Sequence, residues 1–225
     1  MQTHPAALSP IATIQSAIAE LYETPIEFQV EDFLITDLRA IGAPRQSEKI
    51  KTEEMLFVLE TNDGLDISLF LDPSVVDEVN KREPGTPLKL NGMNDYLLAL
   101  EGVSHFQYLI WNAERNKSVT LFELELQAEI DKYILVSILL SKQRNGAIPK
   151  DLYGYLFDAA QFRQDLTPNV AKRYREASHY AGKYCRSLKA EFPTQHHRKD
   201  FLTEIRRFYR LPQNEKVRRI EGARH

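Results

Sequence analysis

The spacing of apolar residues changes twice along this 225-residue chain, and each change restricts the fold. From Ile11 to Leu21 apolar residues recur at the three- and four-residue intervals of an amphipathic helix. Between residues 26 and 71 they mostly alternate with polar residues, which is the period of a strand. After Pro73 the helical spacing returns. The pattern predicts an α+β protein, in which a small antiparallel sheet with an N-terminal helix is followed by a mainly α-helical bundle.

The sheet is expected to be built around one hairpin. The sequence Thr-Asn-Asp-Gly at residues 61–64 separates the apolar runs 55–60 and 65–71, and Asp-Gly tolerates the positive φ angles of a tight turn. Residues 26–30 alternate in the same way, and residues 33–38 continue as extended chain. We therefore expect three or four antiparallel strands.

The helical part is expected to hold most of the chain. Its predicted helices are residues 74–81, 94–115, 120–142, 149–164, 168–192 and 197–210. The breaker Pro84–Pro87 is the better domain boundary, which gives an α/β part at 1–86 and a helical part at 87–211. Residues 212–225 contain few apolar side chains, so we expect a flexible tail there.

Composition limits the classes of protein to which the chain can belong. With 43% hydrophobic and 27% charged residues, the chain has the composition of a globular protein. Its single cysteine, Cys185, excludes an internal disulfide. The N-terminus lacks the basic and apolar regions of a signal peptide, and the longest apolar run is too short for a membrane span. We expect a cytoplasmic protein that does not enter a membrane.

Polar residues fall on one stripe of the predicted helix 94–115. Glu101, Ser104, His105 and Tyr108 are spaced at i, i+3, i+4 and i+7, and they lie beside an apolar stripe. A histidine and a carboxylate one turn apart at the edge of a core raise each other's tendency to be charged. This stripe is therefore the first candidate for a site.

The following helix adds carboxylates to the same region. Glu125 and Glu129 lie on residues 120–142, and a short loop makes the two helices antiparallel neighbours. Glu101, His105 and Glu129 are candidates for acid–base catalysis, and Glu101, His105, Glu125 and Glu129 are candidate ligands for a divalent metal. In this interpretation the protein is a small metal-dependent hydrolase or nuclease. The alternative is a structural network of hydrogen bonds and ion pairs, with Lys132 neutralising Glu129.

Charge is divided unevenly along the chain. Residues 1–166 contain 14 Lys and Arg against 26 Asp and Glu, whereas residues 167–225 contain 15 against 6. The cationic candidates for binding lie on the last two predicted helices and are Arg175, His179, Lys183, Arg186, Arg206 and Arg210. Such a surface can bind an acidic protein surface or a second copy, remain a solvated face, or track the phosphates of a nucleic acid.

The charge of the N-terminal part and the positions of the aromatic residues make a nucleic acid the last of these three alternatives. The acidic N-terminal part would repel a nucleic acid, and the aromatic residues occupy core positions, so a stacking platform is not evident. The first functional hypothesis is therefore a non-enzymatic cytosolic binding or scaffold protein that self-associates and needs no cofactor. The metal-dependent hydrolase is the second hypothesis.

One short element resembles a known family. Arg173 and His179 have five residues between them on a predicted helix, and this spacing is similar to the Arg-x(4–6)-His element of HEPN-type ribonucleases. The resemblance covers seven residues. It implies a helical bundle that cleaves RNA as a dimer, with Arg173 and His179 as catalytic residues. The family's polar residue after the arginine is replaced here by Tyr174, which belongs to the apolar stripe.

Overall fold

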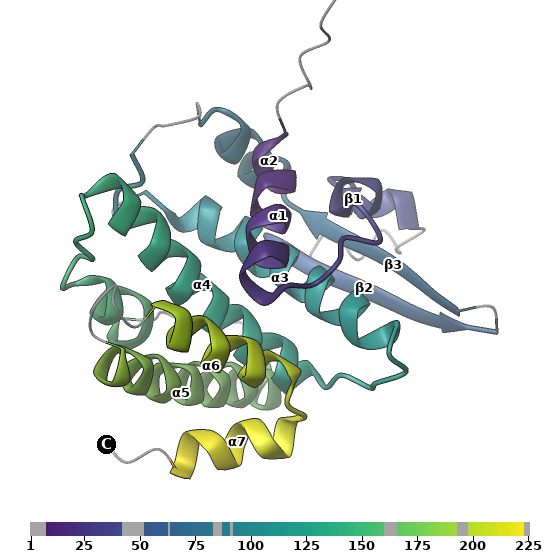
Figure 1. Cartoon of the computed structure of the whole chain (residues 1–225). Helices are drawn as coiled ribbons and strands as arrows, with labels where there is room; N and C mark the ends of the chain where they lie inside the picture. Colours follow the sequence, from purple (N-terminus) through teal and green to yellow (C-terminus); the bar gives the residue numbers. More distant parts are fainter. Residues whose placement is uncertain are drawn as a thin grey trace, which may run out of the picture.

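The structure is a computed structural model, and it describes residues 8–41, 52–62, 64–82, 87–90, 92–159, 166–192 and 198–222. The predicted α+β class is confirmed (Figure 1), because helices form the bulk of the molecule beside a small sheet. The longer helices are α1 (Pro10–Tyr22), α2 (Pro73–Asn80), α3 (Asn94–Ala113), α4 (Leu121–Gln143), α5 (Pro168–Glu191), α6 (Arg198–Arg210) and α7 (Gln213–Gly222).

The sheet has three strands among the described residues, and it is mixed. They are β1 (Leu34–Ile35), β2 (Glu54–Thr61) and β3 (Gly64–Leu71), in the spatial order β1-β3-β2. The predicted β2–β3 hairpin is confirmed, with Glu54 opposite Leu71 and Thr61 opposite Gly64. β1 runs parallel to β3, so the prediction of a purely antiparallel sheet is wrong. The hairpin occupies one side of β3, and β1 joins the other side in the parallel direction.

The extended run expected at residues 26–30 is not a strand. Gln15 of α1 binds this segment instead: its Nε2 donates to the carbonyl oxygen of Phe28 at 2.8 Å, and its Oε1 accepts from the amide of Val30 at 3.0 Å. The 3₁₀ turn Val30–Phe33 follows directly. Because a side chain satisfies the backbone here, the segment needs no neighbouring strand.

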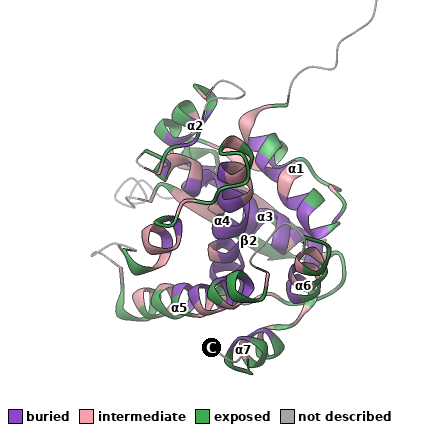
Figure 2. Ribbon diagram, turned by 60° about the vertical axis from the view of Figure 1, so that its left-hand side comes forward, coloured by how far each residue is buried: buried purple, intermediate pink, exposed green. Residues whose placement is uncertain are grey.

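The helices α3 and α4 form the centre of the molecule. α3 packs against α1, α2, β2 and β3, and α4 packs between α3 and α5. Figure 2 shows buried residues concentrated on α3 and α4. α4 is buried on most of its circumference, polar positions included, so its carboxylates lie inside the protein. The division into parts at residues 1–86 and 87–211 stays a prediction.

The C-terminal segment differs from the expected flexible tail at 212–225. Residues 213–222 form α7, whose Lys216 and Ile220 are fully buried. The tail prediction is therefore corrected for this helix, while residues 223–225 lie outside the described part of the chain. Lys216 and Ile220 are one helical turn apart, so α7 docks through a two-residue stripe that is half polar. Within the described chain, no helix combines the length and apolar character that crossing a bilayer requires.

Candidate functional site

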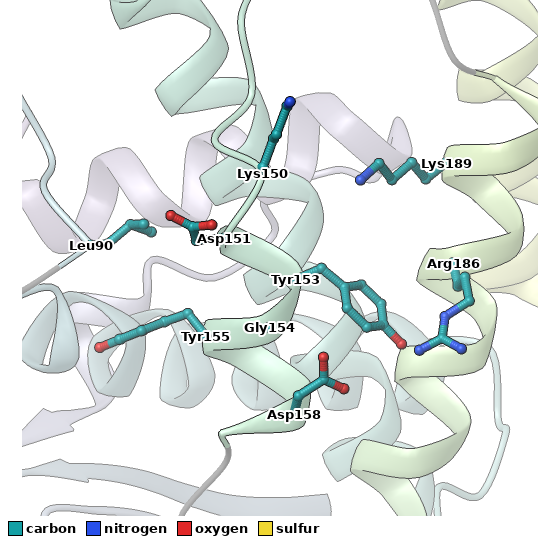
Figure 3. Close-up of a pocket in the computed structure, with 9 residues that line it drawn as sticks. All are labelled: Leu90, Lys150, Asp151, Tyr153, Gly154, Tyr155, Asp158, Arg186 and Lys189. Atoms are coloured by element: carbon teal, nitrogen blue, oxygen red, sulfur yellow. The ribbon is translucent and has the colours of Figure 1, made fainter.

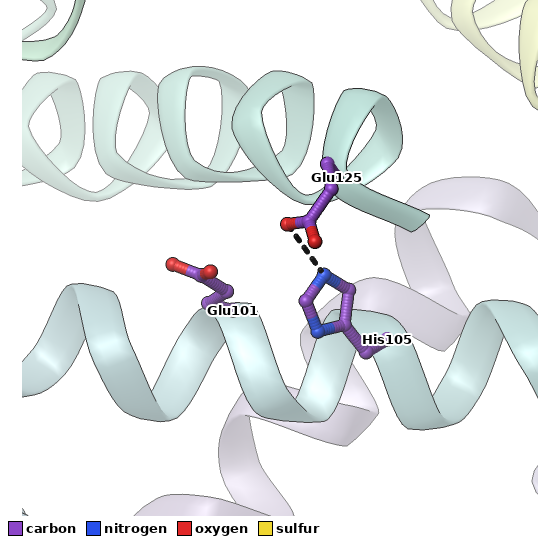
Figure 4. Close-up of side chains that lie close together, drawn as sticks. All are labelled: Glu101, His105 and Glu125. Carbon is purple, nitrogen blue, oxygen red and sulfur yellow. Dashed lines mark ion pairs between the residues drawn. The ribbon is translucent and has the colours of Figure 1, made fainter. Parts of the chain in front are cut away.

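The antiparallel pair α3 and α4 brings three of the predicted metal ligands together. Glu101 and His105 lie one turn apart on α3, and Glu125 faces them from the first turns of α4 (Figure 4). One ligand atom from each residue lies within 4.8 Å of the other two. The capping box of Thr120 and Glu123 fixes the start of α4, and so fixes the height of Glu125 along the pair. We call Glu54, Glu101, His105 and Glu125 the carboxylate–histidine cluster.

His105 is held between two carboxylates. Its Nδ1 lies 3.3 Å from Oε1 of Glu54, and its Nε2 lies 3.6 Å from Oε2 of Glu125. The residue is 6% exposed. Nε2 is fully buried and has no hydrogen-bond partner among the described residues. The ion pair with Glu125 therefore compensates the burial of this nitrogen without a hydrogen bond, and a closer ligand would stabilise it further.

Glu54 is the member of the cluster that the sequence analysis missed. It lies on β2 and reaches the cluster past Gly102 of α3, where an added Cβ would be 3.1 Å from Cγ of Glu54 and 2.9 Å from Cδ1 of Leu69. The missing side chain at Gly102 therefore lets the sheet approach α3 closely. A signal was present, since Glu54 shares the core-facing side of β2 with Leu56.

Glu129 lies next to the cluster in an ion-pair network. Nζ of Lys132 is 2.5 Å from Oε1 of Glu129 and 2.8 Å from Oε2 of Glu101. Glu129 therefore does not join the three ligand atoms that converge, and the neutralisation by Lys132 considered from the sequence is present. Arg173 of α5 approaches from the other side, with Nε 3.6 Å from Oε1 of Glu125.

Burial and neighbouring charges shift the acidities in opposite directions. Burial disfavours the charged form of His105, but Glu54 and Glu125 outweigh it and raise the pKa of His105 well above its usual value. Burial also raises the pKa of Glu54 and of Glu129. For Glu101 the effect of burial is overcome by Lys132 and His105, so its pKa is lowered. The charges of the cluster are therefore balanced by ion pairs with one another and with Lys132.

The donor set fits a small divalent ion. Two ligands about 2.1 Å from one tetrahedral ion are about 3.4 Å apart, close to the 3.6 Å between Nε2 of His105 and Oε2 of Glu125. Glu54 on Nδ1 occupies the place of the outer carboxylate that orients a metal-binding histidine, and a metal at Nε2 would displace the proton that the raised pKa of His105 keeps on the ring. Glu101 pairs with Lys132 through Oε2, so its Oε1 is the oxygen left for coordination.

The predicted cationic residues do not form one surface. Arg206 donates from Nε to the carbonyl oxygen of Leu21 at 2.9 Å, and Arg210 donates from Nη2 to that of Tyr22 at 2.9 Å, so both bind the end of α1. Arg175 and His179 are exposed on α5. The remaining two are also on α5: Lys183 is half-buried, and Arg186 lies over the ring of Tyr153 at 5.0 Å.

The Arg173 and His179 pair of the short resemblance is separated. Arg173 points toward Glu125, whereas His179 is exposed and contacts the ring of Tyr180. Six positions on a helix correspond to about 240° around its axis, so the two side chains leave α5 on different faces. Within one chain, they do not converge on a shared point.

A second buried polar network includes Ser104 and Tyr108 of the predicted polar stripe, but its other members were not predicted. Lys216 donates from Nζ to the hydroxyl oxygen of Tyr108 at 3.0 Å and to Oε1 of Gln127 at 2.8 Å. Asp131 accepts from the hydroxyl of Tyr22 at 2.5 Å and from Oγ of Ser104 at 2.6 Å. The amine of Lys216 and the carboxylate of Asp131 thus find their hydrogen-bond partners within the protein, and the bonds of Lys216 connect α7 to α3 and α4.

The structure also has an open pocket of about 660 Å³ between α5 and the π-helical turn Gly154–Asp158 (Figure 3). Arg186 and Lys189 reach toward it from α5, Asp158 comes from the turn, and Tyr153 precedes the turn. Its full lining is Leu90, Lys150, Asp151, Tyr153, Gly154, Tyr155, Asp158, Arg186 and Lys189. The mixed charge of this lining favours neither an anion nor a cation.

Comparison of the chain with protein-family models, with curated proteins and with solved structures found no significant match. The assignment of a function therefore depends on the geometry of the carboxylate–histidine cluster and of the exposed surfaces.

Proposed function

We propose that the protein is a metal-dependent hydrolase whose divalent ion is bound by Glu101, His105 and Glu125. The observation that carries this proposal is the buried Nε2 of His105, which has no hydrogen-bond partner in the described chain and faces Glu125. Glu54 supports it by holding the opposite nitrogen of the ring. One histidine and two carboxylates suit Zn²⁺ or Mn²⁺.

Glu101, His105 and Glu125 would hold the ion, and the chemistry that it would supply there is the activation of a water molecule as a nucleophile. Glu129 lies beside Glu101 through their shared contact with Lys132, and burial raises its pKa, which makes its carboxylate a stronger base. In this proposal Glu101 and His105 are ligands, and Glu129 receives the proton of the water.

Metal binding is tested with protein purified without a histidine tag. We expect about one equivalent of Zn²⁺ or Mn²⁺ by elemental analysis and titration calorimetry, and loss of binding in His105→Ala and Glu125→Gln. His179→Ala is the matched control, because His179 is exposed on α5 away from the cluster. Equal binding by His105→Ala and the unmodified protein would contradict the proposed ligand set.

The hydrolytic step has a separate test. Glu129→Gln should keep the metal but lose about 10²–10⁴-fold in hydrolysis of a chromogenic ester or phosphodiester, the usual contribution of a general base. A metal-loaded protein that hydrolyses neither class of substrate would leave a metal site without the proposed activity. An unchanged rate in Glu129→Gln would remove Glu129 from the reaction.

We retain binding of an acidic protein surface as a second proposal, on the observation that Arg175 and His179 lie exposed along α5. Arg206 and Arg210 are excluded from this surface, since both bind α1. The proposal predicts salt-sensitive binding to a polyglutamate column that is lost in the double variant Arg175→Glu, His179→Glu. If the protein bound an RNA oligonucleotide but did not bind the polyglutamate column, the ligand of this surface would be a nucleic acid instead.

A further inference from the structure

The strand β2 lies at an edge of the sheet. The spatial order β1-β3-β2 leaves its outer side without a neighbouring strand in the described part of the chain. β2 is eight residues long, whereas β1 at the opposite edge has only two. A long edge strand presents backbone N–H and C=O groups that can pair with another strand.

The half of the hairpin near its turn carries exposed apolar side chains. Val58 is 45% exposed, Leu59 is 63% exposed, and Leu65 of β3 is 39% exposed. Val58 and Leu65 lie on the same side of the sheet as Leu69, which packs against α3 at Gly102. The core-facing side of the sheet thus continues beyond the helices, where the tip of the hairpin projects (Figure 1).

β2 lacks the lysine and proline residues that commonly protect an edge strand from pairing. Its sequence, Glu-Met-Leu-Phe-Val-Leu-Glu-Thr, contains no lysine, no arginine and no proline. Of its two carboxylates, Glu54 is turned inward onto His105. Only Glu60 remains to oppose the approach of another strand.

We infer that β2 pairs in the antiparallel direction with β2 of a second copy of this chain, across a two-fold axis at Val58. In this register Val58 is opposite its own equivalent, Phe57 is opposite Leu59, and Leu56 is opposite Glu60. A register centred on Phe57 would place Glu54 opposite Glu60, and like charges directly opposite each other destabilise a strand pair. The register at Val58 avoids that repulsion.

A second copy suits this edge because a two-fold contact is self-complementary by construction. Pairing would produce a continuous six-stranded sheet, in which Val58 and Leu65 of the two copies share one apolar surface. An eight-residue edge buries less area than a standard stable interface, so the dimer should be weak and in rapid exchange. Its population should therefore depend on protein concentration.

Sedimentation velocity over a concentration series tests the dimer. The unmodified protein should shift from monomer toward dimer across the micromolar range, and Val58→Lys should remain monomeric because two ammonium groups would meet at the axis. Leu121→Lys is the control, since Leu121 is also an exposed apolar residue, at 58% exposure, and lies on α4. A protein that stays monomeric throughout, or a dimer that Val58→Lys leaves unchanged, overturns the inference.

Disulfide trapping tests the register. Val58→Cys should cross-link rapidly under mild oxidation, because opposite residues in a strand pair have the Cα separation that a disulfide needs. The native Cys185 is fully buried and does not compete. Phe57→Cys should cross-link slowly. Preferential cross-linking of Phe57→Cys overturns the proposed axis. Metal binding by each variant, measured in parallel, keeps this result separate from the proposed hydrolase function.

Discussion

Glu54 reaches His105 from the sheet across 51 positions of sequence, and this contact orients the imidazole ring. Glu54→Gln should weaken metal binding about 10–100-fold, the usual cost of removing a carboxylate behind a ligating histidine. Glu53→Gln is the matched control, because the neighbouring Glu53 is exposed. Calorimetric titration with Zn²⁺ measures both variants. Unchanged affinity in Glu54→Gln would show that the ring does not depend on this carboxylate.

The buried amine of Lys216 makes the stability of the protein depend on pH. Burial lowers the pKa of Lys216 from 10.5 to about 7, although Glu123 and Asp131 oppose the shift. Between those two values the unfolded chain binds more protons than the folded protein, so Lys216 makes stability rise with pH in that window. The destabilising contribution is complete below pH 7 and declines above it. Between pH 7 and pH 9 the gain should be about 2 kcal/mol.

Lys216→Met isolates this effect because methionine is uncharged and of similar length. Urea unfolding at pH 7 and pH 9 should show the gain in the unmodified protein and its absence in the variant. Groups remote from Lys216 titrate equally in both proteins, so the comparison cancels them, whereas Asp131 loses in the variant a charge that lowers its pKa. The same pH dependence in both proteins would assign it to another group.

At this scale the sequence allowed the cluster to be predicted in part. Glu101, His105 and Glu125 could be placed together because helical spacing and a short loop fix which residues face each other. Glu54 could not be placed, because the alternation of β2 shows which side faces the core but not which helix covers it. Lys216 was missed because a lysine in a polar segment gives no sign that its amine has two internal acceptors.

Among the elements, α6 stabilises the end of α1. Arg210→Met should remove the bond to the carbonyl oxygen of Tyr22, which lies 2.9 Å away, and cost about 1–3 kcal/mol of unfolding free energy, as for a hydrogen bond from a charged donor. Arg175→Met is the control, because exposed Arg175 should change stability by less than about 0.5 kcal/mol. Urea denaturation measures both. Equal effects of the two substitutions would indicate that the contact contributes nothing.

The elements themselves were largely predictable where local signals agree. Ser9-Pro10 starts α1, the capping box starts α4, and β2 pairs with β3 in the register that the hairpin prediction requires. The direction of β1 was not predictable, since two residues contain no pattern that separates parallel from antiparallel pairing. α7 was missed because its docking stripe includes Lys216, which hydropathy counts as exposed.

At the scale of the whole molecule, metal binding should appear as added stability. A ligand at 100 times its dissociation constant contributes about 2.7 kcal/mol, which for a chain of this length raises the Tm by about 5–11 °C. Differential scanning fluorimetry with Zn²⁺ or Mn²⁺ should show this rise in the unmodified protein and not in His105→Ala. A similar rise in both proteins would place the metal at another site.

The contact between α6 and α1 joins segments that are far apart in the chain. The bonds from Arg206 and Arg210 to α1 span 185 and 188 residues, and the bond from Lys216 to Tyr108 spans 108. Closing such long loops lowers the conformational entropy of the chain before the contacts form and stabilise it, and this slows folding. The α3–α4 hairpin is local and should form early, whereas α1 and α6 should meet late. Refolding should therefore pass through a collapsed state in which α1 and α6 have not yet met and Tyr22 is still exposed to solvent.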